Sequence, residues 1–311
     1  TYLVPRLVRE GADVTVIARR RQNPYVPDPA WSRVRFKEID RVSAETRGTF
    51  GSAVAALDPH VVIDIISFTE ASTRQLVEAL RGRVQHFLHC GTIWVKGHLN
   101  VAPMHEDTPS DPVGAYGVNK RAIADYLLDE ARRGHFPATM IDPGHIVGPG
   151  HTAINPLGNH NPVVFSRLAK GERLPLPHFG MDLLHHVHAD DVAQVFARAM
   201  SRWSVSVGES FFAVSPAAVT TRGYAEEVSR WVGRTAALDF LPWDEWTTAA
   251  DLPPGDIEMS RAHFAHGQCC SIEKATRLLG YRPRYSSFEA IREAVDWLIA
   301  KGTVSLAAAR T

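Results

Sequence analysis

Residues 61–90 read VVIDIISFTEASTRQLVEALRGRVQHFLHC, and this stretch decides the fold. Residues 61–66 and 84–90 are short, mostly apolar runs, and residues 71–80 between them have the apolar spacing of a helix. A helix between two such strands is typical of parallel strands that are joined by a crossover and covered on both faces. The stretch therefore predicts one unit of an α/β protein.

The same alternation continues on both sides of this unit. Residues 1–10 already have the apolar pattern of a helix, so the sequence opens in the middle of the alternation. The predicted fold class is therefore α/β, with a doubly wound parallel sheet. Further strands are expected at residues 14–18, 34–39, 138–141 and 210–214, and further helices at 44–57, 116–133 and 191–200.

The composition excludes several classes of protein. The 311 residues carry 34 Lys and Arg against 34 Asp and Glu, which leaves no net field to attract nucleic acid. No apolar run approaches the roughly 20 residues of a membrane-spanning helix, so we expect no membrane partner. The first residues lack the pattern of a secretory signal, and the three cysteines, two of them adjacent, do not suggest a disulfide framework. The expected location is the cytoplasm.

Two lobes are expected. Residues 1–147 hold most of the sheet, and strands near 184–190 and 210–214 return to it. Residues 148–311 mainly form a smaller lobe, which begins with a stretch rich in Gly, Pro, Asn and His and ends with helices near 271–279 and 287–300. Ligands of open α/β sheets bind beyond the carboxyl ends of the strands. The cleft between the lobes is therefore the predicted binding site.

Three side chains form a candidate catalytic group. Tyr116 and Lys120 are four residues apart at the start of a predicted helix, so they share one face of it. An ammonium group beside a phenol favours the phenolate, which predicts a lowered pKa for Tyr116. Thr92 follows the strand at 84–90 and adds a hydroxyl at the expected cleft. Such a group can hold a carbonyl or alcohol oxygen and move its proton.

From these residues outward, the chain resembles the extended short-chain dehydrogenases/reductases of the NAD-dependent epimerase/dehydratase family. The matching stretches occur in the family's order and run nearly from end to end. They are residues 39–41, 62–64, 92–97, 106–109, 116–120, 143–150, 186–193 and 278–283.

The resemblance implies roles for these residues. Thr92 is the catalytic hydroxyl, Tyr116 the general acid/base, and Lys120 both activates Tyr116 and binds the cofactor ribose. Tyr116 also contacts the cofactor, Asp40 meets the adenine, and Pro143 lies near the nicotinamide. Residues 1–147 become an NAD(P)-binding Rossmann domain and residues 148–311 mainly a substrate-binding lobe. The resemblance also implies a small-molecule substrate, first of all a sugar nucleotide, and a homodimer.

Two departures from the family pattern bear on function. The glycine-rich phosphate loop after the first strand is not among these residues, and since residues 1–10 match the helix that follows it, we expect the strand and loop to precede residue 1. Ile93 and Trp94 follow Thr92 where the family's sugar dehydratases have an Asp-Glu pair. Dehydration is therefore disfavoured, because this apolar pair cannot act as acid and base.

The cofactor is expected to be NADP, with NAD as the alternative. Enzymes of this architecture that use NAD offer a carboxylate after the second strand, whereas an Arg accommodates the 2′-phosphate of NADP. This sequence has Arg19 where the acid would lie, and Arg20 follows it.

Three further residues are candidates for substrate binding. Trp94 lies two residues beyond Thr92, and His145 and His151 lie on the excursion after Pro143. The histidine-rich run 185–188 invites comparison with a metal site, but a strand leading into a helix cap explains it better, so no metal is predicted.

These observations give three hypotheses for function. The first is NAD(P)-dependent hydride transfer at a secondary alcohol or ketone, in the form of sugar-nucleotide epimerisation. The second is NADPH-dependent reduction of a ketone, which Arg19 favours. The third is a non-enzymatic cofactor-binding protein, against which the Thr92, Tyr116 and Lys120 set argues.

Overall fold

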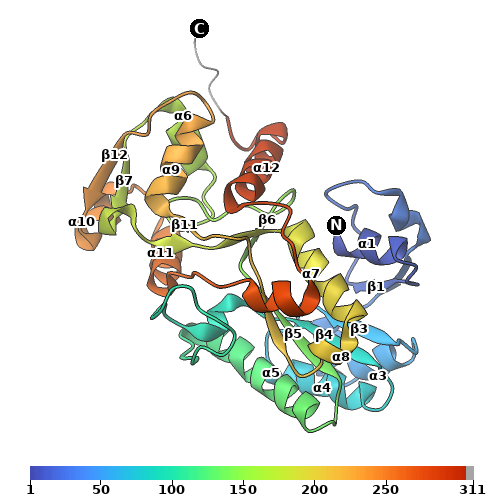
Figure 1. Cartoon of the computed structure of the whole chain (residues 1–311). Coiled ribbons are helices and arrows are strands. Elements are labelled where there is room, and N and C mark those ends of the chain that lie inside the picture. The colour runs from blue at the N-terminus through green and yellow to red at the C-terminus, as the bar shows by residue number, and fades with distance from the viewer. Residues whose placement is uncertain (306–311) are drawn as a thin grey trace.

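The computed structural model describes residues 1–305, and its centre is a sheet formed by β3 (Val61–Asp64), β4 (His86–Cys90), β5 (Ala138–Pro143) and β10 (Ser210–Ala213) (Figure 1). The strand order is β10-β5-β4-β3, and every neighbouring pair is parallel. All residues of β4 and β5 are buried. Because all four strands are parallel, their carboxyl ends lie at the same edge of this piece of the sheet.

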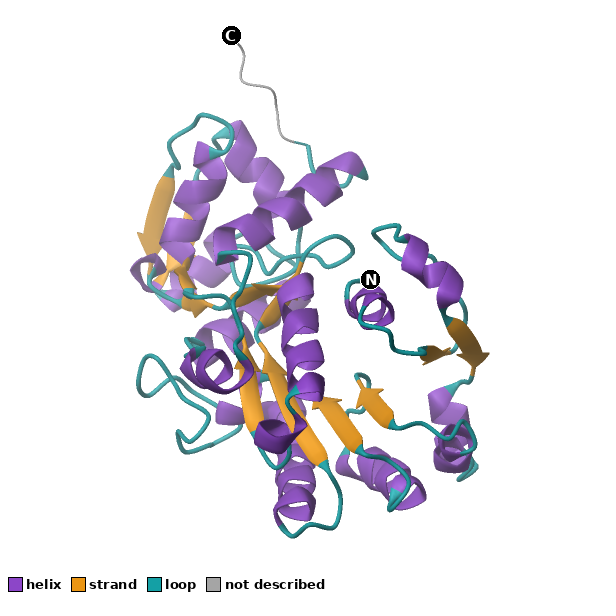
Figure 2. Cartoon of the chain, turned by 45° about the vertical axis from the view of Figure 1, so that its right-hand side comes forward, coloured by secondary structure: helices purple, strands orange, loops and turns teal. Residues whose placement is uncertain are grey.

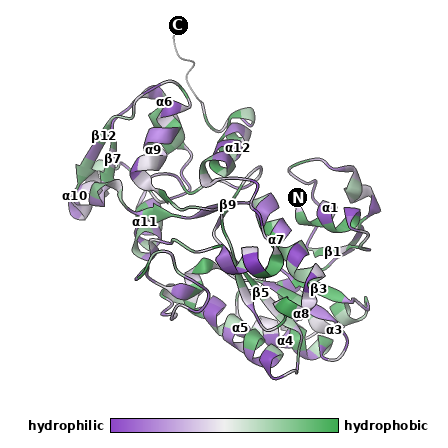
Figure 3. Ribbon diagram, in the orientation of Figure 1, coloured by the Kyte–Doolittle hydropathy of each residue, from purple (hydrophilic) through white to green (hydrophobic). Residues whose placement is uncertain are grey.

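Helices cover both faces of this piece. Phe87 lies in one core cluster with residues of α4 (Glu70–Leu80) and α5 (Gly114–Arg132), whereas its neighbour Leu88 lies in another with residues of α7 (Ala189–Ser201). Figure 3 shows hydrophobic and hydrophilic residues alternating along α5, as expected of a helix with one buried face. The predicted α/β class and doubly wound arrangement are confirmed. The short helix α8 (Trp203–Ser206) follows α7.

The first part of the chain forms a separate two-stranded piece. Here β1 (Thr15–Ala18) pairs in parallel with β2 (Arg35–Glu38), and neither is hydrogen-bonded to β3. Figure 2 shows these two strands set apart from the other four. The expected additional strand and phosphate loop stay a prediction. The helices of this region are α1 (Leu3–Arg9), η1 (Pro29–Arg33), α2 (Arg41–Thr46) and α3 (Phe50–Ala55).

The predicted single helix at 44–57 is wrong, because α2 and α3 are two helices with a turn between them. Gly48 adopts a φ of 67°, a left-handed conformation that ends α2. Thr49 N–H donates back to the carbonyl of Ala44 at 2.8 Å, so the turn is closed by the backbone itself.

A strand does form near residues 184–190, but it does not pair with the strands that were predicted to be its neighbours. It forms β9 (His186–His188), which pairs with β6 (His145–Val147) in a sheet of its own rather than with the four-stranded piece. The strand expected at 210–214 does join that piece, as β10 beside β5. β6 thus leads the chain away from the end of β5, and β9 leads it back to α7, which covers the four-stranded piece.

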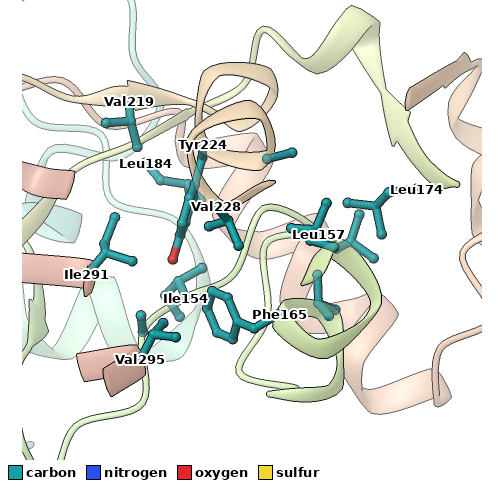
Figure 4. Close-up of a cluster of buried hydrophobic side chains, with 14 of the residues drawn as sticks. Ile154, Leu157, Phe165, Leu174, Leu184, Val219, Tyr224, Val228, Ile291 and Val295 are labelled. Carbon is teal, nitrogen blue, oxygen red and sulfur yellow. The ribbon is translucent and has the colours of Figure 1, made fainter. Parts of the chain in front are cut away.

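The second lobe has its own core. Phe165, Tyr224, Ile291 and Val295 pack there from three different helices (Figure 4). Residues 306–311, part of the lobe predicted to span 148–311, lie outside the described residues. The lobe's elements are α6 (Val163–Lys170), β7 (Leu174–Pro177), η3 (His178–Gly180), β8 (Leu183–Leu184), β11 (Val219–Thr220), α9 (Thr221–Arg230), β12 (Leu238–Leu241), α10 (Trp243–Ala249), α11 (Pro254–His266), the π-helical turn η4 (Ala275–Leu279) and α12 (Ser287–Ala300).

Across residues 1–305, none of the helices combines the length and the apolar character that crossing a membrane requires.

Candidate active site

Thr92 lies just beyond the carboxyl end of β4 and begins the turn η2 (Ile93–Lys96). Its Oγ1 accepts a hydrogen bond from Trp94 N–H at 3.3 Å, which caps η2. Its backbone N–H donates to Oδ1 of Asp142 on β5 at 3.1 Å. Two neighbouring strands therefore fix this hydroxyl.

Tyr116 and Lys120 lie in the first turns of α5, as predicted. Gly117, between them, allows the helix to approach η2, since a Cβ at this position would lie 3.2 Å from the Trp94 carbonyl oxygen. The Nζ of Lys120 donates to the carbonyl oxygens of Ser67 at 2.7 Å and Cys90 at 2.8 Å. Lys120 thereby ties α5 to the loop after β3 and to the end of β4.

One pocket of about 390 Å³ brings most of the predicted site residues together. It lies at the carboxyl end of the strands, where an open α/β sheet binds its ligands. His263 of α11 also lines the pocket, so the second lobe contributes one wall. The predicted residues in its lining are Thr92, Trp94, Tyr116, Lys120, Pro143 and His145.

The electrostatics of Tyr116 differ from the expectation. Burial raises the pKa of Tyr116, and the neighbouring Thr92 side chain partly opposes this. Burial lowers the pKa of Lys120, whose ammonium is held by two carbonyl groups. The predicted lowering of the Tyr116 pKa by Lys120 is therefore wrong for this arrangement. The neighbouring Thr92 side chain is what favours the phenolate.

Neutral aromatic rings form the wall of the pocket. Burial lowers the pKa of His145 well below its usual range and that of His263 to about 4, and these two rings lie 5.0 Å apart. Trp94 stacks on His266 with ring centroids 4.0 Å apart and meets Tyr116 edge-on at 5.9 Å. The imidazoles of His145 and His263 are therefore uncharged near neutral pH, and each can accept or donate single hydrogen bonds.

His151 is a predicted substrate residue that does not line this pocket. It is exposed, and it pairs with Gly148 in an isolated bridge. The neighbouring Gly150 packs against the ring of Tyr25, so this turn faces the first part of the chain. The geometry gives His151 no contact with the other candidates.

Arg19, Arg20 and Asp40 lie together at a different place. Arg19 and Arg20 follow β1, and Asp40 follows the paired strand β2. Asp40 caps α2 through Ser43 N–H at 2.9 Å, and this bond, helped by the charge of Arg19, lowers its pKa. All three side chains are exposed. The residues predicted to bind the adenosine end of the cofactor therefore lie beyond the carboxyl ends of two paired strands.

These two groups of residues fit the two ends of a nicotinamide dinucleotide. The β1–β2 edge offers the guanidinium of Arg19 to a ribose or its phosphate, and the pocket beside Lys120 offers room for the reacting ring. A glycine-rich cradle for the pyrophosphate is not among the residues of this sequence.

The histidine-rich run serves the structure. His185 accepts from Cys270 N–H at 3.1 Å and donates through Nε2 to the Ser215 carbonyl at 2.9 Å. His188 caps α7 by accepting from Asp190 N–H at 3.1 Å. Among residues 1–305, no three His, Cys, Asp or Glu side chains are grouped so as to hold a metal ion.

Sequence reasoning missed two residues of the site. Asp142 stands near the end of a mostly apolar strand, next to Pro143, and a lone carboxylate in such a run was a usable signal. His263 reaches the pocket from α11, far away in the chain, and no local pattern marks it.

The fold and the pocket together define an enzyme of the extended short-chain dehydrogenase type. The chain belongs to the NAD dependent epimerase/dehydratase family, whose model matches residues 1–211. The family named from the motifs is thereby confirmed.

Individual relatives are more distant. "Chloroplast stem-loop binding protein of 41 kDa b, chloroplastic" of Arabidopsis thaliana is 23% identical over 314 residues, covering 97% of this chain and 77% of that protein. An uncharacterized protein of Sinorhizobium fredii (strain NBRC 101917 / NGR234) is 22% identical over 228 residues, covering 71% of this chain and 54% of that protein.

Solved structures share the fold. A putative epimerase from Burkholderia cenocepacia J2315 has a TM-score of 0.70 at 21% identity, and the match covers 96% of this chain and 94% of that chain. UDP-glucose 4-epimerase with UDP-glucose from Thermotoga maritima has a TM-score of 0.70 at 18% identity, again with 96% and 94% covered. Identities this low establish the fold alone.

Proposed function

We propose that this protein transfers hydride at a secondary alcohol or ketone carbon with NAD(P), and that its first substrate class is a sugar nucleotide, which it epimerises. The observation that carries the proposal is the single pocket that holds Thr92, Tyr116 and Lys120. Family membership supports the use of a nicotinamide cofactor.

Each of these three residues has a distinct task at the substrate oxygen. Thr92 holds the oxygen by a hydrogen bond, and Tyr116 takes the hydroxyl proton and later returns it. Lys120 fixes α5 against the loop after β3, which keeps the Tyr116 hydroxyl near Thr92. When bound, the nicotinamide ring accepts and returns the hydride.

The sugar-nucleotide class rests on the family and on what related structures contain. UDP-glucose 4-epimerase of Thermotoga maritima was solved with UDP-glucose, and UDP-glucuronic acid 4-epimerase of Bacillus cereus with UDP-glucuronic acid and NAD. In the present chain, the neutral imidazoles of His145 and His263 supply hydrogen-bonding groups that suit a hydroxylated ring.

A second candidate is NADPH-dependent reduction of a ketone. It is favoured by Arg19 at the end of β1, because an Arg at this place suits the 2′-phosphate of NADP. An epimerase recycles its cofactor, whereas a reductase consumes it.

The test is a turnover assay of the full-length protein with UDP-sugars and with model ketones. Epimerisation is expected to convert the sugar without net change in nicotinamide absorbance, whereas reduction lowers that absorbance in proportion to product. Tyr116→Phe is expected to lose at least about 100-fold in rate, since general acid/base groups contribute about 10² to 10⁴. Tyr25→Phe, at an exposed tyrosine outside the pocket, is the matched control. Equal rates for Tyr116→Phe and the control would overturn the proposal.

A further inference from the structure

A buried carboxylate lies directly behind the turn that carries Thr92. Asp142 is only 2% exposed, and its Oδ1 accepts the hydrogen bond from Thr92 N–H. Strands β4 and β5 continue their pairing up to this point, since Gly91 N–H donates to the Ile141 carbonyl at 2.7 Å. Asp142 therefore stands beside the Gly91–Thr92 peptide rather than in the pocket lining.

Gly91 makes this close approach possible. A Cβ at Gly91 would lie 3.1 Å from Cγ of Asp142 and only 1.9 Å from its Oδ1, a distance that no side chain can occupy. The same carboxylate oxygen, Oδ1, thus lies against Gly91 and accepts the hydrogen bond from Thr92 N–H. The position of Thr92 depends on Asp142 through both contacts.

No lysine neutralises Asp142 by direct pairing within residues 1–305. Lys96 is buried and donates to the carbonyl oxygens of Glu106 at 2.7 Å and Thr108 at 2.8 Å, while Lys120 is held by two other carbonyls. The titratable groups that face Asp142 are Cys90 of β4, Lys96 of η2, Glu106 of the following loop, Tyr116 and Lys120 of α5, and Cys270 of the C-terminal segment.

The surroundings of Asp142 make both of its charge states accessible. Burial raises the pKa of Asp142 to about 7, against the lowering effects of the Thr92 N–H and of Lys96. Burial is the main cause of the raised pKa of Tyr116, and the negative charge of Asp142 adds to it. Protonation of Asp142 is therefore expected to lower the pKa of Tyr116, although the two side chains belong to different elements.

We propose that Asp142 is a positioning residue whose charge state governs the Thr92–Tyr116 pair. The ionised carboxylate strengthens the bond to Thr92 N–H and disfavours the Tyr116 phenolate; the neutral carboxyl loosens the turn and favours the phenolate. The tasks of Thr92 and Tyr116 rest on the proposed function, but the coupling between Asp142 and Tyr116 does not.

The first test follows the carboxyl group itself. Infrared spectra of the full-length protein and of Asp142→Asn are recorded against pH, because Asn keeps an acceptor for Thr92 N–H but cannot ionise. The expected result is a carbonyl band of a protonated carboxyl group that fades near pH 7 in the parent protein and is missing in the variant. A carboxylate that stays ionised down to pH 5 overturns the proposal.

The second test follows Tyr116. Its phenolate is measured by ultraviolet difference against Tyr116→Phe, in the parent and in the Asp142→Asn background. The expected result is titration at lower pH in Asp142→Asn, with at least about twice the phenolate fraction below the midpoint. Asp129→Asn, which removes an exposed carboxylate from the same helix as Tyr116, is the control and leaves the titration unchanged. Equal titrations in Asp142→Asn and the control overturn the proposal.

A third variant covers the case in which Asp142→Asn fails to fold. Lys96→Met removes a charge that lowers the pKa of Asp142, so the infrared midpoint is expected to move to higher pH. An unmoved midpoint overturns the proposal. None of these measurements needs a substrate, so a failure of the proposed reaction and a failure of the Asp142 coupling give different results.

Discussion

The two pieces of the sheet differ in how firmly they are enclosed. Every residue of β4 and β5 is buried, whereas the residues of β1 are only partly buried and those of β2 are mostly exposed. The enclosed piece carries Thr92 and Asp142 at its strand ends, and the open piece carries Arg19 and Asp40. The residues proposed for proton chemistry thus lie where the strands are buried, and those proposed to select the cofactor lie where side chains are exposed.

The carboxylates show the same contrast in their pKa values. In the four-stranded piece, burial raises the pKa of Asp142 to about 7. In the two-stranded piece, hydrogen bonds to backbone N–H groups lower the pKa values of the partly exposed Asp28 and the exposed Asp40. The contribution of Asp142 to stability is therefore lost as pH rises, and the contributions of Asp28 and Asp40 are lost as pH falls. Each prediction below tests one side of this comparison.

The largest effect is expected where the two pieces are joined. Arg41 begins α2, after β2, and pairs with Asp64 at the end of β3 at 2.6 and 3.1 Å, with both side chains almost fully buried. Arg41→Ala leaves Asp64 buried without its partner, which costs about 3 to 5 kcal/mol of unfolding free energy. Urea unfolding of the full-length protein measures it.

The control for this change is an exposed ion pair of the open piece. Arg35 and Asp13 form a pair in which both side chains are about two-thirds exposed, at 67% and 68%. Arg35→Ala is expected to cost less than about 1 kcal/mol. A similar cost for Arg35→Ala and Arg41→Ala would mean that the Arg41–Asp64 pair does not join the two pieces.

The second effect concerns the pH dependence of stability. Because the pKa of Asp142 is raised from 3.8 to about 7 in the folded protein, its protonated form is favoured by folding, and this contribution is lost as pH rises through that window. Asp142→Asn cannot ionise and escapes the loss. The free energy of unfolding of the variant, relative to that of the parent, should therefore increase by about 1 kcal/mol for each unit by which pH rises across the window. Thermal unfolding at pH 5 and pH 8 checks this, and a gain at pH 5 that vanishes at pH 8 contradicts it.

The third effect compares one substitution in both pieces. Ile141 of β5 is 0% exposed, whereas Ile17 of β1 is only partly buried. Ile141→Ala is expected to cost about 3 kcal/mol or more, and Ile17→Ala about 2 kcal/mol less, because less apolar surface and a smaller cavity are involved. Equal midpoints and slopes in urea for the two variants would show that the open piece is as well packed as the enclosed one.

The same contrast explains what the sequence could and could not predict. Apolar runs such as the one that forms β4 indicate a buried parallel strand, and the order of strands and helices then predicts the doubly wound sheet. Thr92, Tyr116 and Lys120 were identifiable because each lies at a strand end or helix start that the pattern locates.

Other features depend on long-range packing, which a local pattern does not encode. The partners of the Lys120 ammonium are carbonyl groups of two distant segments, so its effect on Tyr116 was predicted wrongly. His263 reaches the pocket only because α11 folds back over Trp94. β9 reads as a sheet strand, yet its partner β6 was not foreseeable from its own residues.

The smallest effect on stability, and the most selective effect on binding, is expected at the open edge. Arg19 is exposed, so Arg19→Asp should change the unfolding free energy by no more than about 0.5 kcal/mol. A carboxylate at this place repels a 2′-phosphate but can accept a hydrogen bond from a ribose hydroxyl. NADPH binding by the full-length protein is therefore expected to weaken by about tenfold or more, with NADH binding unchanged or improved, as followed by nicotinamide fluorescence. Arg21→Asp, two residues further along the same exposed loop, makes the same charge change and should affect both cofactors little. If Arg19→Asp weakened both cofactors equally, the β1 edge would be a general anion site, and cofactor choice would have to be made within the enclosed piece.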